Sequence, residues 1–298
     1  MLLEIQRHAA ELNNSGRQES ALDNVRRRYF TQLAQHTGRA TISYYSGWLD
    51  RSDHPGVSIN DSDKNAFMSA VHQLPRDRGL DLILHTPGGE TAATESIVDY
   101  LRKMFGNNIR ALVPQMAMSG GTMIACACKS IVMGKQSNLG PIDPQLRGVP
   151  AKEVIAEFDR AVRDVEENPA SIPIWQSIIG NYHPGFLEMC EQAVEYSEKI
   201  TAAWLRTGMF NGEKEATPRA RKAVEQLADT RTTHTHARHL HIDDVRRFGL
   251  KVESLEDDPD LQDLLLTVHH AYMHSFAMSN AVKIIENHNG VGVIRTAT

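Results

Sequence analysis

The chain has 298 residues, a length that can bury a large core as one domain or as two smaller ones. Hydrophobic residues make up 41% and charged residues 23%, and the formal net charge is −5, which excludes a disordered chain and a strongly basic nucleic-acid-binding protein. The three cysteines, Cys126, Cys128 and Cys190, are an odd count whose spacing fits no four-ligand zinc site. We therefore expect buried free thiols in the reducing cytoplasm.

Neither a secretory leader nor a membrane span is expected. The first residues carry charges at Glu4 and Arg7 and contain no long apolar stretch. The most apolar segment, 111–133, is interrupted by Ser119-Gly120-Gly121 and by Lys129-Ser130, whereas a span needs roughly 20 mostly apolar residues. The sequence thus gives no indication of membrane association.

Residues 1–38 are polar and charged with a weakly helical pattern. We expect a peripheral N-terminal helical segment there, with a solvated arm as the alternative, and one main domain at 39–298. From residue 41 the pattern alternates between strand and helix. The predicted elements are a strand at 41–45, a helix at 61–73, a strand at 80–84, a helix at 91–105, a strand at 109–113, a helix at 119–128 and a strand at 130–133. This alternation predicts an α/β fold whose parallel sheet is built from βαβ units.

The second half of the chain is mainly helical in pattern. Four predicted helices open at or near a proline, which suits the first turn of a helix; they cover 151–167, 173–179, 184–206 and 218–227. We expect them to form a helical layer on the sheet. Near the C-terminus, 282–285 and 291–295 flank Asn289-Gly290, a pair that adopts the positive φ angles of a tight turn. This pattern predicts a C-terminal hairpin.

Two glycine-containing turns follow predicted strands. Gly88-Gly89 precedes a helix, where bare N–H groups and the helix dipole favour an oxyanion or a phosphate. Two glycines alone are more often plain turn residues, and no dinucleotide-binding or Walker-type motif accompanies them. Ser119-Gly120-Gly121 has the same place in the next unit. A serine there is usually a helix cap, but its small and apolar surroundings also suit a nucleophile, with the Gly89 and Gly120 N–H groups converging on the attacked carbonyl oxygen.

Three segments occur in order along the chain, namely Leu84-His85-Thr86-Pro87-Gly88-Gly89, Met116-Ala117-Met118-Ser119-Gly120-Gly121 and Leu139-Gly140-Pro141-Ile142-Asp143-Pro144-Gln145. Together they resemble the serine dehydrogenase proteinase family, relatives of ClpP and signal peptide peptidase A with the ClpP/crotonase fold. The resemblance covers roughly 41–295 and extends through Gly249-Leu250-Lys251-Val252. It implies a ClpP/crotonase-like peptidase domain and the hydrolysis of peptide bonds through an acyl-enzyme.

The resemblance leaves the general base open. In ClpP a histidine follows the nucleophile where this chain has Asp143, which excludes a triad in the ClpP order. The signal peptide peptidase relatives use a lysine, but this chain has none between Lys152 and Lys199. A Ser-Lys dyad is therefore disfavoured, and Lys152 is kept as a reserve base. The resembled family orders its triad as serine, aspartate, histidine, which implies Ser119, Asp143 and a later histidine.

That histidine lies in a cluster, whose members are His234, His236, His239 and His241. We favour His236, because a Thr-His pair at this place resembles the relatives. His236 would then take the proton of Ser119 while Asp143 orients the imidazole. The simpler alternatives are ordinary surface histidines and, for Asp143, a turn residue held by Pro141 and Pro144.

Other histidines are weaker candidates. His270 and His274 lie four apart on a predicted helix and can be combined with Glu286 or His288 into a metal site. A helical pair without a His-Glu-x-x-His pattern more often packs in the interior, so we expect no metal. His85 is expected as a half-buried strand residue rather than a substrate contact.

The sequence thus predicts a cytoplasmic serine peptidase that acts on peptides or proteins and needs no cofactor. Folds of this kind commonly form rings or stacks, so by analogy we expect a homo-oligomer. One alternative is a crotonase-type acyl-CoA enzyme that uses the same glycine N–H groups; the Ser119-Gly120-Gly121 context argues against it. The other is a weakly active adaptor subunit in which Ser119 lacks an aligned base.

Overall fold

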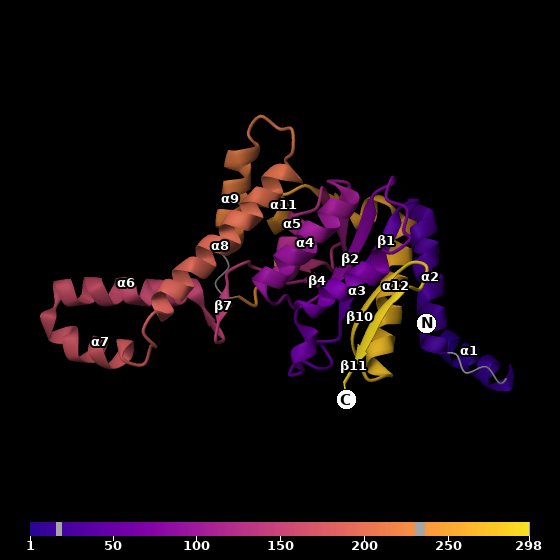
Figure 1. The fold of residues 1–298 in the computed structure, drawn as a ribbon, viewed down its shortest axis with the longest axis horizontal. Coiled ribbons are helices and arrows are strands. Elements are labelled where there is room, and N and C mark those ends of the chain that lie inside the picture. Colours follow the sequence, from indigo (N-terminus) through magenta and orange to yellow (C-terminus); the bar gives the residue numbers. More distant parts are fainter. Residues whose placement is uncertain (16–19, 230–235, 298) are drawn as a thin grey trace.

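A seven-stranded sheet forms the centre of the fold (Figure 1). The computed structural model describes residues 1–15, 20–229 and 236–297. In spatial order the strands are β11 (Gly292–Thr296), β10 (Ala281–Asn287), β1 (Ala40–Ser46), β2 (Leu80–His85), β3 (Ile109–Val113), β5 (Ser130–Met133) and β9 (Val252–Ser254). The strands from β1 to β9 pair in parallel, whereas β10 is antiparallel to β1 and β11 is antiparallel to β10. The predicted α/β fold, with its parallel sheet and C-terminal hairpin, is confirmed.

Alternating side chains along the strands divide the core into two layers. In β2, Leu82 and Leu84 enter one hydrophobic cluster and Ile83 enters the other. In β3, Val113 and Leu112 divide in the same way. Because both faces of these strands are buried, their sequences are continuous apolar runs rather than alternations of apolar and polar residues.

Helices cover both faces of the sheet. One face carries α2 (Ala21–Thr37) and α12 (Pro259–Ala277), whose Phe30, Leu33 and Leu265 are fully buried. The other face carries α3 (Ser62–Val71), α4 (Thr91–Phe105), α5 (Gly120–Cys126), α9 (Ala216–Ala228) and the C-terminal part of α8 (Phe186–Thr207). The boundary expected at residue 38 falls at the junction of α2 and β1, where Gly38 ends the helix at φ 64°. The division into a peripheral segment at 1–38 and one main domain at 39–298 stays a prediction.

The N-terminal helix α1 (Leu2–Ser15) packs against α2. The remaining elements are short; they are α11 (Ile242–Arg247), β4 (Met116–Ala117), β6 (Asn138–Leu139), β7 (Gln145–Leu146), β8 (Val149–Pro150), η1 (Pro55–Val57), η2 (Pro169–Ser171) and η3 (Leu255–Asp257). β4 pairs with β6 in parallel, and β7 forms a small antiparallel hairpin with β8. Both small pairs lie in the stretch of chain between Met116 and Pro150, which also holds two of the candidate catalytic residues.

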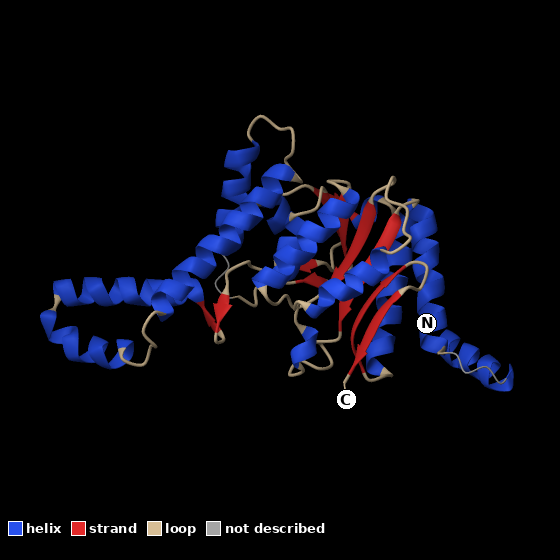
Figure 2. Ribbon diagram, viewed as in Figure 1, coloured by secondary structure: helices blue, strands red, loops and turns tan. Residues whose placement is uncertain are grey.

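Two of the predicted helices stand off the sheet. Figure 2 shows α6 (Ala151–Glu167) and α7 (Ile172–Ile179) as an arm that projects from the body. The arm has its own hydrophobic cluster, in which Val154 of α6 packs with Phe186 and Cys190 from the start of α8. The expected helical layer is thus formed by α8 and α9, while α6 packs its apolar face against the start of α8.

The cysteines agree with expectation. Cys126, Cys128 and Cys190 are all buried and free. Burial raises the pKa of the Cys128 thiol to about 12, which makes it an inert packing residue. Among the helices of the described ranges, none combines the length and the apolar character that a membrane crossing requires.

Candidate active site

A cavity of about 660 Å³ opens where loops leave the sheet. Its lining includes Pro87 to Ala92 after β2, Ser119 after β4, Ile142 and Pro144 to Leu146 after β6, and His236. Ligands in parallel sheets bind at the carboxyl ends of the strands, because the connecting loops meet there. The motifs that the sequence analysis selected therefore share one cavity.

The Gly88-Gly89 turn is held by a neighbouring segment. Ile59 N donates a hydrogen bond to Gly88 O at 2.7 Å, and Glu90 N donates to Ile59 O at 3.0 Å. A methyl group added to Gly89 would lie 2.3 Å from Ile59 N. Only glycine lets the two backbones approach this closely, so Gly89 has a steric reason to be glycine.

Ser119 has an unusual backbone conformation. Its φ is 48° and its ψ is −114°, and its side chain makes no capping hydrogen bond to α5. Non-glycine residues at positive φ store strain, which recurs where a nucleophile sits on a sharp turn between a strand and a helix. Gly88 allows this turn to come close, because a methyl group there would lie 2.6 Å from Ser119 Cβ. The helix-cap interpretation of Ser119 therefore does not describe its hydroxyl.

Two backbone N–H groups near Ser119 have no acceptor among the described residues. Ile59 pairs with Gly88 and Glu90, which leaves Gly89 N without a partner. Gly120 N belongs to the first turn of α5, where helix amides have no partner within the helix. A methyl group on Gly120 would lie 3.4 Å from Gly89 N, so the two amides are close neighbours.

Asp143 and His236 form a hydrogen-bonded pair. His236 Nδ1 lies 2.9 Å from Asp143 Oδ1. The Asp143 side chain is 1% exposed and that of His236 is 28% exposed, so a buried carboxylate faces an imidazole at the cavity wall. Asp143 Oδ2 is buried and has no hydrogen-bond partner within the described ranges. Ser119 and His236 line the same cavity, and no direct hydrogen bond joins their side chains.

The other candidate bases lie elsewhere. Lys152 Nζ is paired with Glu198 at 2.6 Å. His239 is exposed, and His241 precedes α11 with its N–H directed to Asp244. His234 lies outside the described residues.

The other residues considered in the sequence analysis, His85 and Glu286, have different contacts. His85 is fully buried rather than half-buried, and it packs against the rings of Tyr45 and Trp48. Burial lowers the pKa of His85 to about 4, although hydrogen bonds from its ring partly oppose this shift. Glu286, considered as a metal ligand, is instead hydrogen-bonded to Arg26 at 2.6 Å.

A family model described as "ClpP-like SDH-type serine proteinase" matches residues 54–283. The chain belongs to this family. The family description supplies the ClpP-like fold and a serine peptidase activity at the level of the family, in agreement with the expectation from the three motifs.

Two curated relatives of this SDH-type proteinase come from Methanocaldococcus jannaschii. The uncharacterized protein MJ0137 is 29% identical over 66% of this chain and 61% of its own length. The uncharacterized protein MJ1495 is 26% identical over 66% of this chain and 59% of its own length. The match thus spans about three fifths of each relative. A solved structure, a mutant of the membrane-bound stomatin-specific protease 1510-N, aligns with a TM-score of 0.29 and 16% identity over 66% of this chain and 92% of its own.

Sequence reasoning missed a polar residue that ties the site loops together in this SDH-type proteinase. The Thr122 hydroxyl lies 2.8 Å from Ala117 O and 2.9 Å from Gly140 O, and it accepts a hydrogen bond from Gly140 N at 2.9 Å. It therefore joins the turn before Ser119 to the turn before Asp143. The available signal was one hydroxyl inside an otherwise small and apolar helix.

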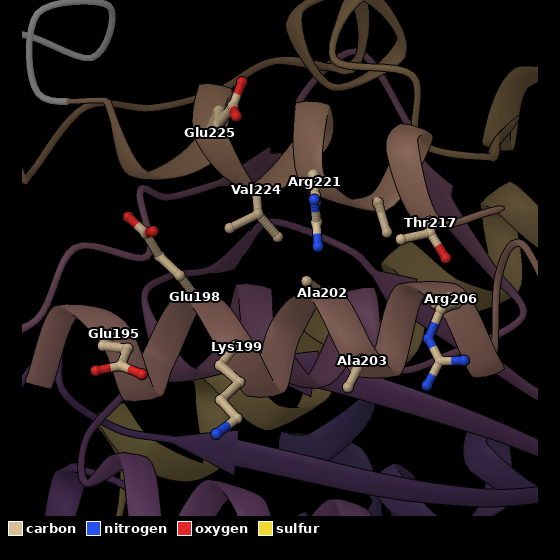
Figure 3. A pocket seen from close by; sticks show the side chains of 11 residues that line it. Glu195, Glu198, Lys199, Ala202, Ala203, Arg206, Thr217, Arg221, Val224 and Glu225 are labelled. Atoms are coloured by element: carbon tan, nitrogen blue, oxygen red, sulfur yellow. The ribbon is translucent and has the colours of Figure 1, made fainter. Parts of the chain in front are cut away.

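A second cavity, of about 500 Å³, lies between α8 and α9 (Figure 3). Arg221 and Val224 of α9 point across it toward Ala202 of α8. None of the candidate catalytic residues lines it. The candidate catalytic residues therefore belong to the cavity at Ser119 and not to this one.

Proposed function

We propose that this SDH-type proteinase hydrolyses peptide bonds through an acyl-enzyme on Ser119. His236 acts as the general base, and Asp143 orients it. The observation that carries the proposal is the meeting, at one cavity, of an uncapped serine at positive φ, two amides without an acceptor among the described residues, and His236, whose imidazole is hydrogen-bonded to the buried Asp143 behind it.

The protonation of the pair follows from the chemistry of its atoms. An ionised carboxylate only accepts hydrogen bonds, so the proton of the imidazole lies on Nδ1 and is donated to Asp143. Nε2 is then the free base. It takes the hydroxyl proton of Ser119 as Oγ attacks the carbonyl carbon of the scissile bond.

The carbonyl oxygen becomes an oxyanion in this step. The N–H groups of Gly89 and Gly120 donate to it, and this stabilisation is strongest in the transition state. His236 next gives its proton to the departing amine. A water molecule, deprotonated by the same Nε2, then cleaves the acyl-enzyme. The hydrogen bond between a catalytic serine and its histidine is often long without substrate and tightens in the complex. On the proposal, the bond between Ser119 and His236 forms in this way when substrate binds.

Three further points complete the proposal. Peptides or proteins are the substrates. The protein assembles with copies of itself, for which the exposed apolar side chains of Val162, Ile174 and Met189 on the arm and the start of α8 offer contact surface. It works in the cytoplasm, since its three thiols are all free.

An acyl-CoA enzyme with the same oxyanion donors would have no use for the His236–Asp143 pair, which favours the peptidase. The test is labelling by a biotinylated fluorophosphonate, followed by intact mass. We expect one adduct on the wild type and on Ser69→Ala, a control at an exposed serine of α3, and none on Ser119→Ala. A folded wild type without an adduct, or a labelled Ser119→Ala, would contradict the proposal.

A further inference from the structure

A buried ion pair lies behind the loop that carries Gly89. Lys283 of β10 and Asp63 in the first turn of α3 are both fully buried. Lys283 Nζ lies 2.9 Å from Asp63 Oδ1 and 2.8 Å from Oδ2. The Tyr44 hydroxyl donates a further hydrogen bond to Oδ2 at 2.8 Å. Burying two charges costs several kcal/mol per ion, and apolar residues of the same volume often serve stability as well or better. The pair therefore calls for an explanation other than stability.

The pair holds the backbone on both sides of Ile59. Lys283 Nζ donates a hydrogen bond to Ser58 O at 2.7 Å. Asp63 Oδ2 accepts one from Asn60 N at 3.2 Å. Each charged group thus makes one hydrogen bond to the main chain of a residue that lines the cavity.

Ile59, in turn, holds the backbone on both sides of Gly89. Its N–H donates to Gly88 O, and its carbonyl accepts from Glu90 N, at 2.7 and 3.0 Å. Its Cδ1 lies 3.3 Å from the position of a methyl group on Gly120. The direction of the Gly89 N–H is therefore set by Ile59, and the place of Ile59 is set by the ion pair.

We propose that Lys283 and Asp63 are positioning residues that aim the Gly89 N–H into the oxyanion hole by fixing Ser58 and Asn60. This inference rests on the proposed function of Ser119. The pair touches neither substrate nor nucleophile, and it acts only through the backbone of residues 58–60. Burial lowers the pKa of Lys283, and Asp63 opposes that shift, so the ammonium form that donates to Ser58 depends on its partner.

A neutral double variant separates positioning from stability. Lys283→Met with Asp63→Asn removes both buried charges and leaves the partly exposed Arg295, 3.6 Å from Asp63 Oδ1, to solvent, whereas the single change Lys283→Met would leave the buried carboxylate with Arg295 as its only cation. The amide oxygen in Asp63→Asn still accepts from Asn60, but the methionine donates nothing to Ser58. We expect the urea midpoint to stay near that of the wild type. The maximal rate constant of fluorophosphonate labelling should fall about ten- to hundredfold, with the half-saturating probe concentration unchanged.

Two further variants serve as rescue and control. Lys283→Gln with Asp63→Asn restores a neutral donor toward Ser58, and we expect it to recover part of the labelling rate. Arg26→Met with Glu286→Gln neutralises the other buried pair of β10, whose side chains are 0% and 1% exposed and which makes no contact with residues 58–60. This control should label at the wild-type rate.

Hydrogen–deuterium exchange gives a readout that does not depend on activity. The amides of Ile59 and Glu90 should lose protection in the methionine double variant and keep it in the control. Labelling at the wild-type rate, or unchanged protection, would overturn the inference. If the folded wild type itself fails to label, the proposed function is wrong, and exchange at these two amides still decides whether the pair holds the loop.

Discussion

Asp143→Asn is the sharpest test of the His–Asp pair. The substitution keeps the shape of the side chain but turns one carboxylate oxygen into an NH₂ donor. In the wild type, Oδ1 faces His236 Nδ1 at 2.9 Å, and the buried Oδ2 has no partner among the described residues. The amide can therefore take two orientations, and each has a defined consequence.

With its oxygen toward His236, the amide buries an NH₂ group without an acceptor, which costs about 1–3 kcal/mol. Turned around, the NH₂ group donates to Nδ1, and the imidazole proton moves to Nε2, which can then no longer act as a base. The turned amide leaves a carbonyl oxygen at the Oδ2 position, which lacks a donor in the wild type as well, so the buried site favours this unproductive orientation by up to roughly 150-fold. Loss of the negative charge that stabilises the imidazolium adds to this, so we expect labelling of Ser119 to slow by about 10²- to 10⁴-fold.

The assay is the rate of fluorophosphonate labelling by intact mass, with urea unfolding to verify the fold. His236→Ala and the double variant His236→Ala/Asp143→Asn are the controls. Because residues of one catalytic unit are not additive, the double variant should be no slower than His236→Ala alone. Labelling of folded Asp143→Asn at the wild-type rate would refute the assignment of Asp143.

Three more predictions concern buried contacts. Gly89→Ala places a methyl group 2.3 Å from Ile59 N and should slow labelling by at least about a hundredfold. The control Gly106→Ala is also at positive φ but has no atom within 4 Å, so it should keep the wild-type labelling rate and lose roughly 1–2 kcal/mol of unfolding free energy in urea. Equal labelling rates for the two variants would contradict the steric argument. Arg26→Met removes the fully buried partner of Glu286, which keeps only the 38% exposed Arg27 at 3.0 Å as a cation, and should lower the free energy of unfolding by about 3 kcal/mol. Burial opposes the charge on Glu286, but Arg26, Arg27 and the Tyr272 hydroxyl together outweigh it and hold the pKa of this carboxyl below its ordinary 4.5. Its stabilising effect is therefore present above that pH and is lost as the pH falls through the folded value. The stability difference between the wild type and Glu286→Gln, from urea titrations, should therefore shrink below pH 4.5, and a difference that grows on acidification would contradict it.

Features with a local signal were predictable from the sequence. The helix expected at 91–105 and the one expected at 151–167 have these same ends in the structure. A glycine turn after an apolar run marks the end of β2, and Asn289-Gly290 marks the hairpin between β10 and β11. Such signals depend on a few adjacent residues, whose conformational preferences act within one turn of chain.

The element against which a helix packs was not predictable from such local signals. The pattern of α6 shows that one of its faces is apolar, but it does not say what covers that face. The structure gives the start of α8 as the partner, through Val154 and Phe186, where the sequence analysis expected the sheet. Amphipathic periodicity predicts burial without naming the neighbour.

The site residues also divide into those with a local sequence signal and those without one. Ser119 and Gly89 lie in motifs of adjacent residues. His236 meets Asp143 across 93 positions, and Lys283 meets Asp63 across 220. No short pattern marks either pair: a resemblance to relatives pointed to the first, and only the folded chain reveals the second.

The pairing of β10 with β1 has a consequence for the order of events during synthesis. The ribosome adds Ser119, Asp143 and His236 well before it reaches Lys283. β1 cannot pair with β10 until more than two hundred further residues have been added. Contacts of such long separation form late, because the closure of a large loop precedes them. On the proposed arrangement, the nascent chain carries its nucleophile for some time without a formed oxyanion loop. On this proposal, the chain would reach its full activity only after Lys283 has been made and β10 has paired with β1.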